Sequence, residues 1–287
     1  MYLYHQQTTI PRDYAKRKIE EFLLEDIPGF DKTTKGIFSG NEMIQAVVQA
    51  EEDLVFAGGV ILDIFFDNHN SQVNILVPDG IAVQKGQELA EIIALAPVVL
   101  SRERVLLNLL QRMSGVATLA KKYSEIAKPY DVKILDTRKT TPGLRLFEKY
   151  AVCVGGCYNH RMDLSSGILI KDNHIKAAGG VKNAVFKIKS RNYGLPIELE
   201  VENFEQLTEG IESGADGFLL DNMRPDVIKE AVNIIRNSPG GKDIFIEASG
   251  GINLENLEEY VKTGVDAISA GALTHSVKSS NIHIELT

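Results

Sequence analysis

Apolar residues at helical spacing predict a first helix over residues 14–24, with Ile19, Phe22 and Leu23 on one side. Gly29 and the polar run Asp31 to Lys35 are expected to end it. Short apolar segments follow, separated by turn-forming residues, which is the pattern of a small antiparallel β unit. The expected strands cover residues 45–48, 54–56, 60–66 and 72–77, and the expected turns cover residues 58–59, 68–70 and 78–80.

The pattern changes in the second half of the chain. Residues 101–127 predict a long helix that is interrupted only at Ser114 and Gly115. Short apolar runs then alternate with amphipathic helical stretches, which indicates βαβ units and a parallel sheet. The runs are residues 132–135, 168–170, 197–201, 218–220, 244–246 and 267–268, and the clearest helices are residues 203–212, 225–235 and 254–262.

Polar residues follow each of these apolar runs. In a parallel α/β barrel the carboxyl ends of the strands meet on one face, where active sites lie. Ordinary βα loops are polar as well, but six successive strand ends with both signs of charge favour a site. The polar groups are Asp136 to Lys139, Lys171 to His174, Glu200 with Glu202, Asp221 with Asn222, Glu247 to Gly251, and Ser269 to Gly271.

Composition narrows the class of ligand and the compartment. The net charge of −8 over 287 residues does not favour nucleic acid or an anionic membrane as a partner. No stretch approaches the roughly 20 apolar residues of a membrane span, and the polar start has no apolar signal-peptide core. The only cysteines, Cys153 and Cys157, suit a reducing cytosol, so a cytoplasmic protein is expected.

A basic set lies at or near adjacent strand ends. In an acidic protein such a set indicates an anionic ligand, because arginine holds carboxylates or phosphates in bidentate fashion and lysine adds a point charge. The alternative is a set of salt bridges to Asp136, Asp163 and Asp172. The members of the basic set are Arg138, Lys139, His160, Arg161 and Lys171.

An acidic pair, Glu200 and Asp221, ends two successive strands. Carboxylates there can bind sugar hydroxyls, hold a divalent cation or act as acid–base groups, or they can simply pair with the basic set. Glu198, Glu200 and Glu202 alternate along one strand and share a face. We place Glu200 in the site and keep the other two as neighbours of it.

Two small-residue turns end the last two strands. Ser249-Gly250-Gly251 and Ala270-Gly271-Ala272 let backbone N–H groups approach a phosphate, and late barrel loops are the usual phosphate site. By contrast, Cys153, Cys157 and His160 provide too few ligands for a structural zinc site. Packed or loosely exposed thiols are expected instead.

Several of these segments resemble the quinolinate phosphoribosyltransferase family. The resemblance covers nearly the whole expected barrel, and its motifs are long. They are Asp136 to Arg145, Asn159 to Arg161, Leu169 to His174, Glu198 to Glu202, Leu219 to Asn222, Glu247 to Gly251 and Gly271 to Ser276, with Arg104 to Asn108 and Ser114 to Thr118 upstream.

The resemblance implies an incomplete, open α/β barrel of the TIM type with a smaller N-terminal α/β sandwich domain, working as a homodimer or a larger homo-oligomer. It places the N-terminal domain at residues 1–115 and the catalytic barrel at residues 116–276. Whether residues 277–287 pack on the N-terminal domain stays open.

The implied reaction joins quinolinate to phosphoribosyl pyrophosphate and gives nicotinate mononucleotide, carbon dioxide and pyrophosphate, with Mg²⁺, in NAD biosynthesis. By resemblance the basic set binds the quinolinate carboxylates and nearby phosphates, and Arg104 enters the site from a neighbouring subunit. Glu200 and Asp221 would face the ribose hydroxyls and the Mg²⁺. Ser249, Gly250, Gly271 and His275 would hold the 5′-phosphate, and Lys139, Lys171, Glu200 and Asp221 would be catalytic.

Two departures and three alternatives remain. Cys157 stands where the family often has a third glycine, and Phe30 to Thr34 replace a common Gly-Asp-apolar-Thr pattern. One alternative is the molybdenum-transport-associated branch of the family, although that branch tends to lose the Lys-Asp-Asn-His motif kept at residues 171–174. The others are a Schiff-base barrel lyase using Lys171 and a non-enzymatic phosphate-ligand sensor.

Overall fold

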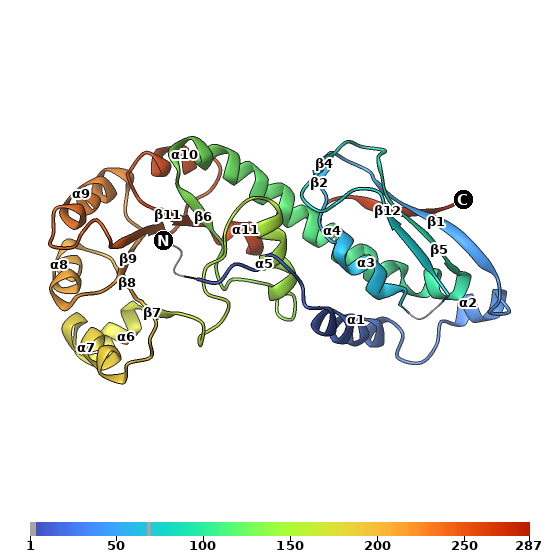
Figure 1. Ribbon diagram of the computed structural model, residues 1–287, viewed down its shortest axis with the longest axis horizontal. Coiled ribbons are helices and arrows are strands. Elements are labelled where there is room, and N and C mark those ends of the chain that lie inside the picture. The colour runs from blue at the N-terminus through green and yellow to red at the C-terminus, as the bar shows by residue number, and fades with distance from the viewer. Residues whose placement is uncertain (1–3, 68–69) are drawn as a thin grey trace. The chain divides into compact units, whose positions relative to one another are not determined.

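The computed structural model describes residues 4–67 and 70–287, so residues 68 and 69 of the turn expected at 68–70 lie outside the described residues. The chain forms two compact units (Figure 1). The first contains residues 4–6, 122–139 and 157–275, and the second contains residues 7–121, 140–156 and 276–287.

The second unit is built on a four-stranded antiparallel sheet with the strand order β12-β1-β5-β3. The last strand of the chain pairs with β1, so residues 276–287 belong to this unit. The strands are β1 (Met43–Ala50), β3 (Gln72–Ile75), β5 (Glu88–Leu95) and β12 (Ile282–Leu286), with a separate pair β2 (Leu54–Val55) and β4 (Ala82–Val83). The helices are α1 (Arg12–Asp26), α2 (Lys32–Ile37), α3 (Gly59–Phe65), α5 (Arg145–Val154) and the first part of α4 (Ala96–Ala127).

The strand expected at residues 60–66 is wrong, because this segment is helix α3. Its apolar residues are buried at positions 61, 62, 64 and 65, which is helical spacing. The helix begins after Gly58, and the Asp79 carboxylate accepts the N–H groups of Gly58 and Gly59 at distances of 2.7–3.1 Å. A cap supplied from twenty residues away is not visible in a local pattern.

Two further expectations about helices are corrected. The polar run after Gly29 does not only end α1, because Asp31 accepts the N–H groups of Thr33 and Thr34 and starts helix α2. Helix α4 runs from residue 96 to 127 without interruption. Gly115 is small for a packing reason, since an added Cβ would lie 2.4 Å from the carbonyl oxygen of Lys278.

The first unit is built on a six-stranded sheet with the order β6-β11-β10-β9-β8-β7, in which every neighbouring pair is parallel. The sheet has two edges, β6 and β7, so the barrel is open as predicted. Figure 1 shows α7 to α10 on the outer side of these strands. The strands are β6 (Lys133–Leu135), β7 (Ile168–Ile170), β8 (Ile197–Val201), β9 (Gly217–Asp221), β10 (Phe245–Ser249) and β11 (Ala267–Ser269).

The helices of this unit follow the strands as the alternating pattern predicts. Gly210 on α8 faces β8 and β9 closely, since an added Cβ would lie 2.5 Å from the Leu199 side chain. The helix expected at residues 254–262 is shorter in the structure. The helices are α6 (Asp172–Ala178), α7 (Val181–Arg191), α8 (Phe204–Ser213), α9 (Pro225–Arg236), α10 (Leu257–Val261) and α11 (Ala272–His275), with a 3₁₀ turn at Lys128–Tyr130.

Over the part of the chain that the structure describes, no helix combines the length and apolar composition needed to cross a bilayer.

Candidate active site

A cavity of about 340 Å³ lies at the carboxyl ends of the parallel strands of the first unit. It brings together nine of the predicted site residues, although they come from six separate segments of the chain. The predicted residues that line it are Arg138, Lys139, His160, Arg161, Lys171, Glu200, Asp221, Ser249 and Gly250. The cavity is also lined by Thr137, Leu169, Leu219, Asn222, Gly251 and Ser269.

The loop that carries His160 and Arg161 is tied to the end of β6 by Asp136. This fully buried carboxylate accepts the side-chain amide of Asn159 at 2.7 Å and the backbone N–H of His160 at 2.9 Å. The backbone of Tyr158 continues the sheet beside Leu135. Asp136 is therefore a structural anchor of the site, and its burial is compensated by hydrogen bonds.

The basic side of the cavity is arranged for an anion. Burial, and then the positive charge of Arg138, lower the pKa of Arg161. The like charges of Arg138 and Arg161 repel each other, and an anion bound in the cavity would relieve that repulsion. The Arg161 guanidinium also donates to the carbonyl of Gly167 at 3.1 Å, which fixes its direction.

The acidic side of the cavity is formed by the ends of β8 and β9. Glu200 is paired with the ammonium group of Lys171. Burial, and then the charge of Glu200, raise the pKa of Asp221. Asn222 donates to Asp221 at 2.7 Å, so one oxygen of Asp221 is already occupied. Like charges at this edge favour a bound cation.

The turn after β10 needs glycine. Gly250 has a φ of +97°, and an added Cβ would lie 2.2 Å from the side-chain oxygen of Asn222. The Ser249 carbonyl accepts the backbone N–H of Asn222, and the Ser249 hydroxyl accepts a hydrogen bond from the Ser269 hydroxyl at 2.9 Å. The turn therefore brings the Ser249 hydroxyl and the Gly250 backbone to the same cavity as the carboxylates.

Gly271 and His275, also predicted for the phosphate, do not line this cavity. They lie directly behind Lys139, which does. An added Cβ at Gly271 would lie 2.8 Å from the His275 ring and 3.2 Å from Cδ of Lys139. The Thr274 hydroxyl donates to the Lys139 carbonyl at 2.8 Å, so α11 holds the Lys139 segment in place.

The other predicted residues lie outside the cavity. Arg104 lies on α4 in the second unit, with 63% of its side chain exposed and Glu103 at 3.8 Å. Cys153 is half-buried and Cys157 is buried, and neither forms a disulfide. Glu202 is exposed, unlike Glu198 and Glu200 on the same strand.

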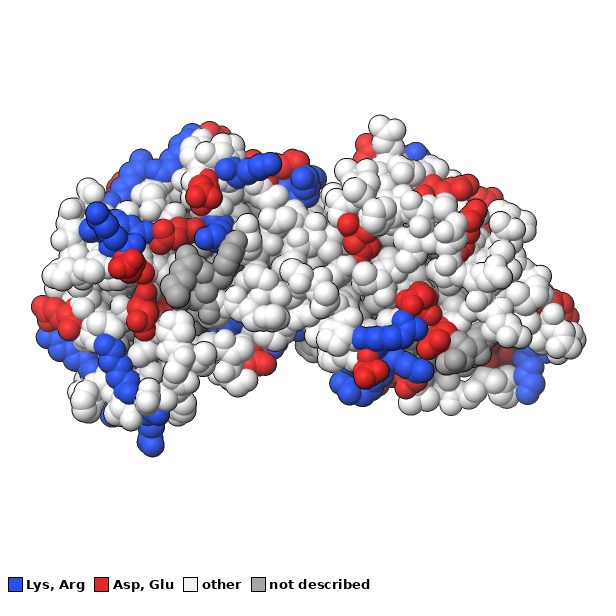
Figure 2. All heavy atoms as spheres, in the orientation of Figure 1, with Lys and Arg blue, Asp and Glu red and all other residues white. Residues whose placement is uncertain are grey.

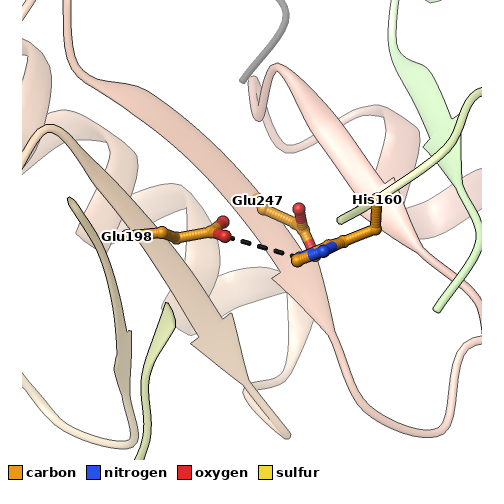
Figure 3. Close-up of side chains that lie close together, drawn as sticks. All are labelled: His160, Glu198 and Glu247. Carbon is orange, nitrogen blue, oxygen red and sulfur yellow. Dashed lines mark ion pairs between the residues drawn. The ribbon is translucent and has the colours of Figure 1, made fainter. Parts of the chain in front are cut away.

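The structure adds a buried cluster that the sequence pattern did not assign. Among the described residues, His160, Glu198 and Glu247 are the one set of three potential ligand groups whose atoms lie within 4.8 Å of one another (Figure 3). Nε2 of His160 lies 3.4 Å from Oε2 of Glu198 and 3.8 Å from Oε1 of Glu247. Burial, and then the charge of Glu198, raise the pKa of Glu247 to about 8. The alternation of Glu198 with Glu200 was the available signal for Glu198.

Figure 2 shows basic and acidic side chains interspersed on the face of the molecule that it draws. They do not gather into one broad basic patch there. A face with mixed charges does not attract a polyanion over a long range. We therefore expect anion binding to depend on the local basic groups of the cavity.

Comparison with known proteins identifies the family. Residues 116–285 match the C-terminal domain of quinolinate phosphoribosyl transferase, and residues 31–114 match its N-terminal domain. The chain belongs to the quinolinate phosphoribosyltransferase family.

Named relatives agree with this membership. A Bacillus subtilis (strain 168) protein described as "Probable nicotinate-nucleotide pyrophosphorylase (carboxylating)" is 43% identical over 95% of this chain and 93% of its own length. The human nicotinate-nucleotide pyrophosphorylase (carboxylating) is 35% identical over 93% of this chain and 90% of its own length. Among solved structures, the Francisella tularensis nicotinate-nucleotide pyrophosphorylase has a TM-score of 0.91 at 34% identity and covers 99% of each chain.

Proposed function

We propose that this member of the quinolinate phosphoribosyltransferase family transfers the phosphoribosyl group of phosphoribosyl pyrophosphate to quinolinate, with loss of carbon dioxide, in NAD biosynthesis. The observation that carries the proposal is that one cavity is lined both by the five residues of the basic set and by the carboxylates of Glu200 and Asp221. The products are nicotinate mononucleotide, pyrophosphate and carbon dioxide.

The basic residues explain the choice of acceptor. Quinolinate carries two adjacent carboxylates, and Arg138 and Arg161 repel each other unless an anion lies between them. Lys171 and Lys139 add charge at the same cavity. We assign the two quinolinate carboxylates to this side, with Ser249 and Gly250 facing the 5′-phosphate and Gly271 with His275 supporting Lys139.

The reaction needs orientation and charge stabilisation more than a protein nucleophile. The quinolinate nitrogen attacks the anomeric carbon while pyrophosphate leaves, and positive charge develops on the ribose ring. We assign Glu200 and Asp221, which line the cavity, to stabilise that charge. Loss of carbon dioxide leaves its electron pair on C2 of the ring, where the positive charge of the adjacent pyridinium nitrogen stabilises it, and a proton then takes the place of the carboxylate on that carbon. We assign Lys139 and Lys171, which line the cavity, to supply that proton.

The carboxylate pair also fits a divalent cation. Glu200 and Asp221 offer oxygen ligands. Burial, and then the like charge of Glu200, raise the pKa of Asp221, and a cation would neutralise that like charge. They supply only two protein ligands, which suits Mg²⁺ because this ion keeps several waters and binds substrate phosphates. We assign Mg²⁺ to them, where it would neutralise the pyrophosphate leaving group.

The Schiff-base alternative is disfavoured by the structure. An imine-forming lysine must be neutral when it attacks a carbonyl, and it is usually kept so by an apolar pocket or a second cation. Lys171 is instead engaged in an ion pair with the Glu200 carboxylate, and its side chain is not enclosed in an apolar pocket.

We further propose that the protein works in the cytoplasm as a homodimer or larger homo-oligomer, with Arg104 completing the site of a neighbouring subunit. The Arg104 side chain is 63% exposed, which suits a residue that binds an anion on a neighbouring subunit.

The decisive experiment mixes the protein with phosphoribosyl pyrophosphate, Mg²⁺ and quinolinate and measures nicotinate mononucleotide. Formation of the product that stops on addition of a chelator supports both the reaction and the metal. Absence of product under these conditions refutes the proposed function. Product that continues at full rate with a chelator keeps the reaction and removes Mg²⁺.

A further inference from the structure

A short N-terminal segment packs on the loop that carries Arg161. We call residues 4–6 the N-terminal strap; they belong to the same compact unit as the cavity. The Gln6 side chain forms two hydrogen bonds with the backbone of Asn159: its amide donates to the carbonyl at 3.0 Å, and its oxygen accepts the N–H at 2.7 Å. The strap is therefore fixed at the residue just before His160.

Tyr4 packs against both groups that orient Arg161. Its ring stacks on the His160 ring, with centroids 4.2 Å apart and planes 22° apart. On another side it touches Gly167, where an added Cβ would lie only 2.5 Å from the tyrosine ring. The His160 ring accepts the backbone N–H of Arg161, and the Gly167 carbonyl accepts a hydrogen bond from the Arg161 guanidinium at 3.1 Å. Tyr4 thus supports Arg161 from both ends.

The Tyr4 hydroxyl contacts the buried cluster of His160, Glu198 and Glu247. It donates to Glu198, the carboxylate that also faces His160. Nδ1 of His160 accepts the backbone N–H of Arg161 at 2.7 Å, so the proton of the neutral ring is assigned to Nε2, the nitrogen that faces Glu198 and Glu247. Both ring nitrogens are engaged within the protein.

These contacts divide the roles of His160 and Arg161. A histidine whose nitrogens face a backbone N–H and a buried carboxylate has no ring N–H left for a substrate anion. Arg161 also lines the cavity. The buried cluster and Tyr4 therefore hold the His160 ring in place, and the His160 ring in turn holds Arg161. We assign the binding of the anion to Arg161.

We propose that Tyr4 is a positioning residue for acceptor binding: it holds His160 and Gly167, and through them sets the direction of Arg161. This proposal rests on the proposed function, because it assumes that Arg161 binds the acceptor carboxylate. It makes a residue of the N-terminal strap part of the acceptor site, although Tyr4 does not line the cavity.

The kinetic test compares Tyr4→Phe, Tyr4→Leu and a control, His5→Ala. His5 is the exposed neighbour of Tyr4 in the same strap. Tyr4→Phe keeps the stacking ring and loses the hydrogen bond to a charged group, so we expect KM for quinolinate to rise roughly tenfold. KM for phosphoribosyl pyrophosphate should change less than about twofold, since this loss is local to the acceptor side. Tyr4→Leu also loses the stacking and should raise KM for quinolinate further, and His5→Ala should behave as wild type.

Three results would overturn the proposal. Unchanged KM for quinolinate in both Tyr4 variants would remove the positioning role. An equal rise of both KM values, with a lower Tm, would show that Tyr4 only stabilises the fold. The same kinetic change in His5→Ala would show that the strap is sensitive to any substitution.

A measurement independent of turnover separates this proposal from the proposed function. In protein labelled with ¹⁵N-histidine, the signal lost in His160→Gln identifies the His160 ring. We expect the Nε2–H form in wild type and a changed signal in Tyr4→Phe. If wild type makes no nicotinate mononucleotide, the proposed function fails, and an unchanged His160 signal in Tyr4→Phe still refutes the role of Tyr4.

Discussion

Nε2 of His160 lies 3.4 Å from Oε2 of Glu198, inside the core of the parallel sheet rather than in the open part of the cavity. Glu247 completes this arrangement from β10 (Figure 3). Two negative charges on carboxylates this deeply buried would be destabilised by lost hydration and by mutual repulsion, and a proton on Glu247 reduces both effects. The raised pKa of Glu247 is the expression of this constraint.

The first prediction concerns the pH dependence of stability. Because the pKa of Glu247 is raised to about 8 in the folded chain, the native state holds one more proton than the unfolded state between about pH 4.5 and 8. This term lowers the free energy of unfolding as pH rises through that window, by up to about 1.4 kcal/mol per pH unit. Above pH 8 the term is constant.

Glu247→Gln tests this sign, because glutamine has a similar shape and does not titrate. We expect its free energy of unfolding, measured by urea at several pH values, to exceed that of wild type at pH 9 and to lose the advantage near pH 5. Glu255→Gln, an exposed substitution elsewhere in the same unit, serves as the control. Parallel pH profiles for Glu247→Gln and wild type would contradict the assignment of a neutral Glu247.

The second prediction concerns the acceptor. Nicotinate lacks one of the two carboxylates of quinolinate, so it would leave part of the basic side of the cavity unpaired. We expect kcat/KM for quinolinate to exceed that for nicotinate by at least about a thousandfold. Arg161→Lys should reduce this ratio, since a point charge replaces a bidentate donor. Comparable turnover of the two acids would remove the assignment of the basic set to a dicarboxylate.

The third prediction concerns the acidic pair. Asp221→Asn and Glu200→Gln should each lower kcat/KM by roughly 10²–10³-fold, because they remove charge that stabilises the transition state. Their Tm values should stay close to that of wild type, since both side chains face the cavity. Glu202→Gln, at the exposed position directly after β8, is the matched control. Near-normal activity in both variants would reassign the pair as structural.

Much of the first unit could be predicted from the sequence, and the reason is visible in particular residues. The six parallel strands are short apolar runs, and each is followed by polar residues such as Lys171 and Asp221 that line the cavity. The alternation of strands and helices predicts the topology, because a helical crossover after each strand makes the strands parallel and brings all their carboxyl ends to one edge of the sheet.

The errors arose where distant residues decide local structure. Helix α3 depends on Asp79 for its cap, and Gly115 is packed against Lys278 instead of breaking α4. The buried cluster was missed for the same reason, because His160, Glu198 and Glu247 lie in separate segments that only the folded chain brings together. Patterns within a window cannot report such pairs.

The fourth prediction tests the turn after β10. Gly250→Ala should lower activity because the added methyl group meets the Asn222 side chain and the backbone has a φ that alanine rarely adopts. Gly251→Ala is the control for space, since an added Cβ there meets nothing within 4 Å although its φ is also positive. We expect KM for phosphoribosyl pyrophosphate to rise more in Gly250→Ala than in Gly251→Ala. Equal effects would mean that backbone strain, not the contact with Asn222, is responsible.

The last prediction tests whether Arg104 serves a neighbouring subunit. Arg104→Ala should weaken quinolinate binding, and Lys139→Ala should abolish turnover within its own cavity. If Arg104 acts in trans, a mixed dimer of the two variants contains one site with both residues intact, so activity should recover toward about a quarter to a half of wild type. Co-expression with two different tags allows the heterodimer to be purified and assayed. Mixing Arg104→Ala with itself gives the control, and a verified heterodimer with no recovered activity would show that Arg104 acts within its own chain or has no role in the site.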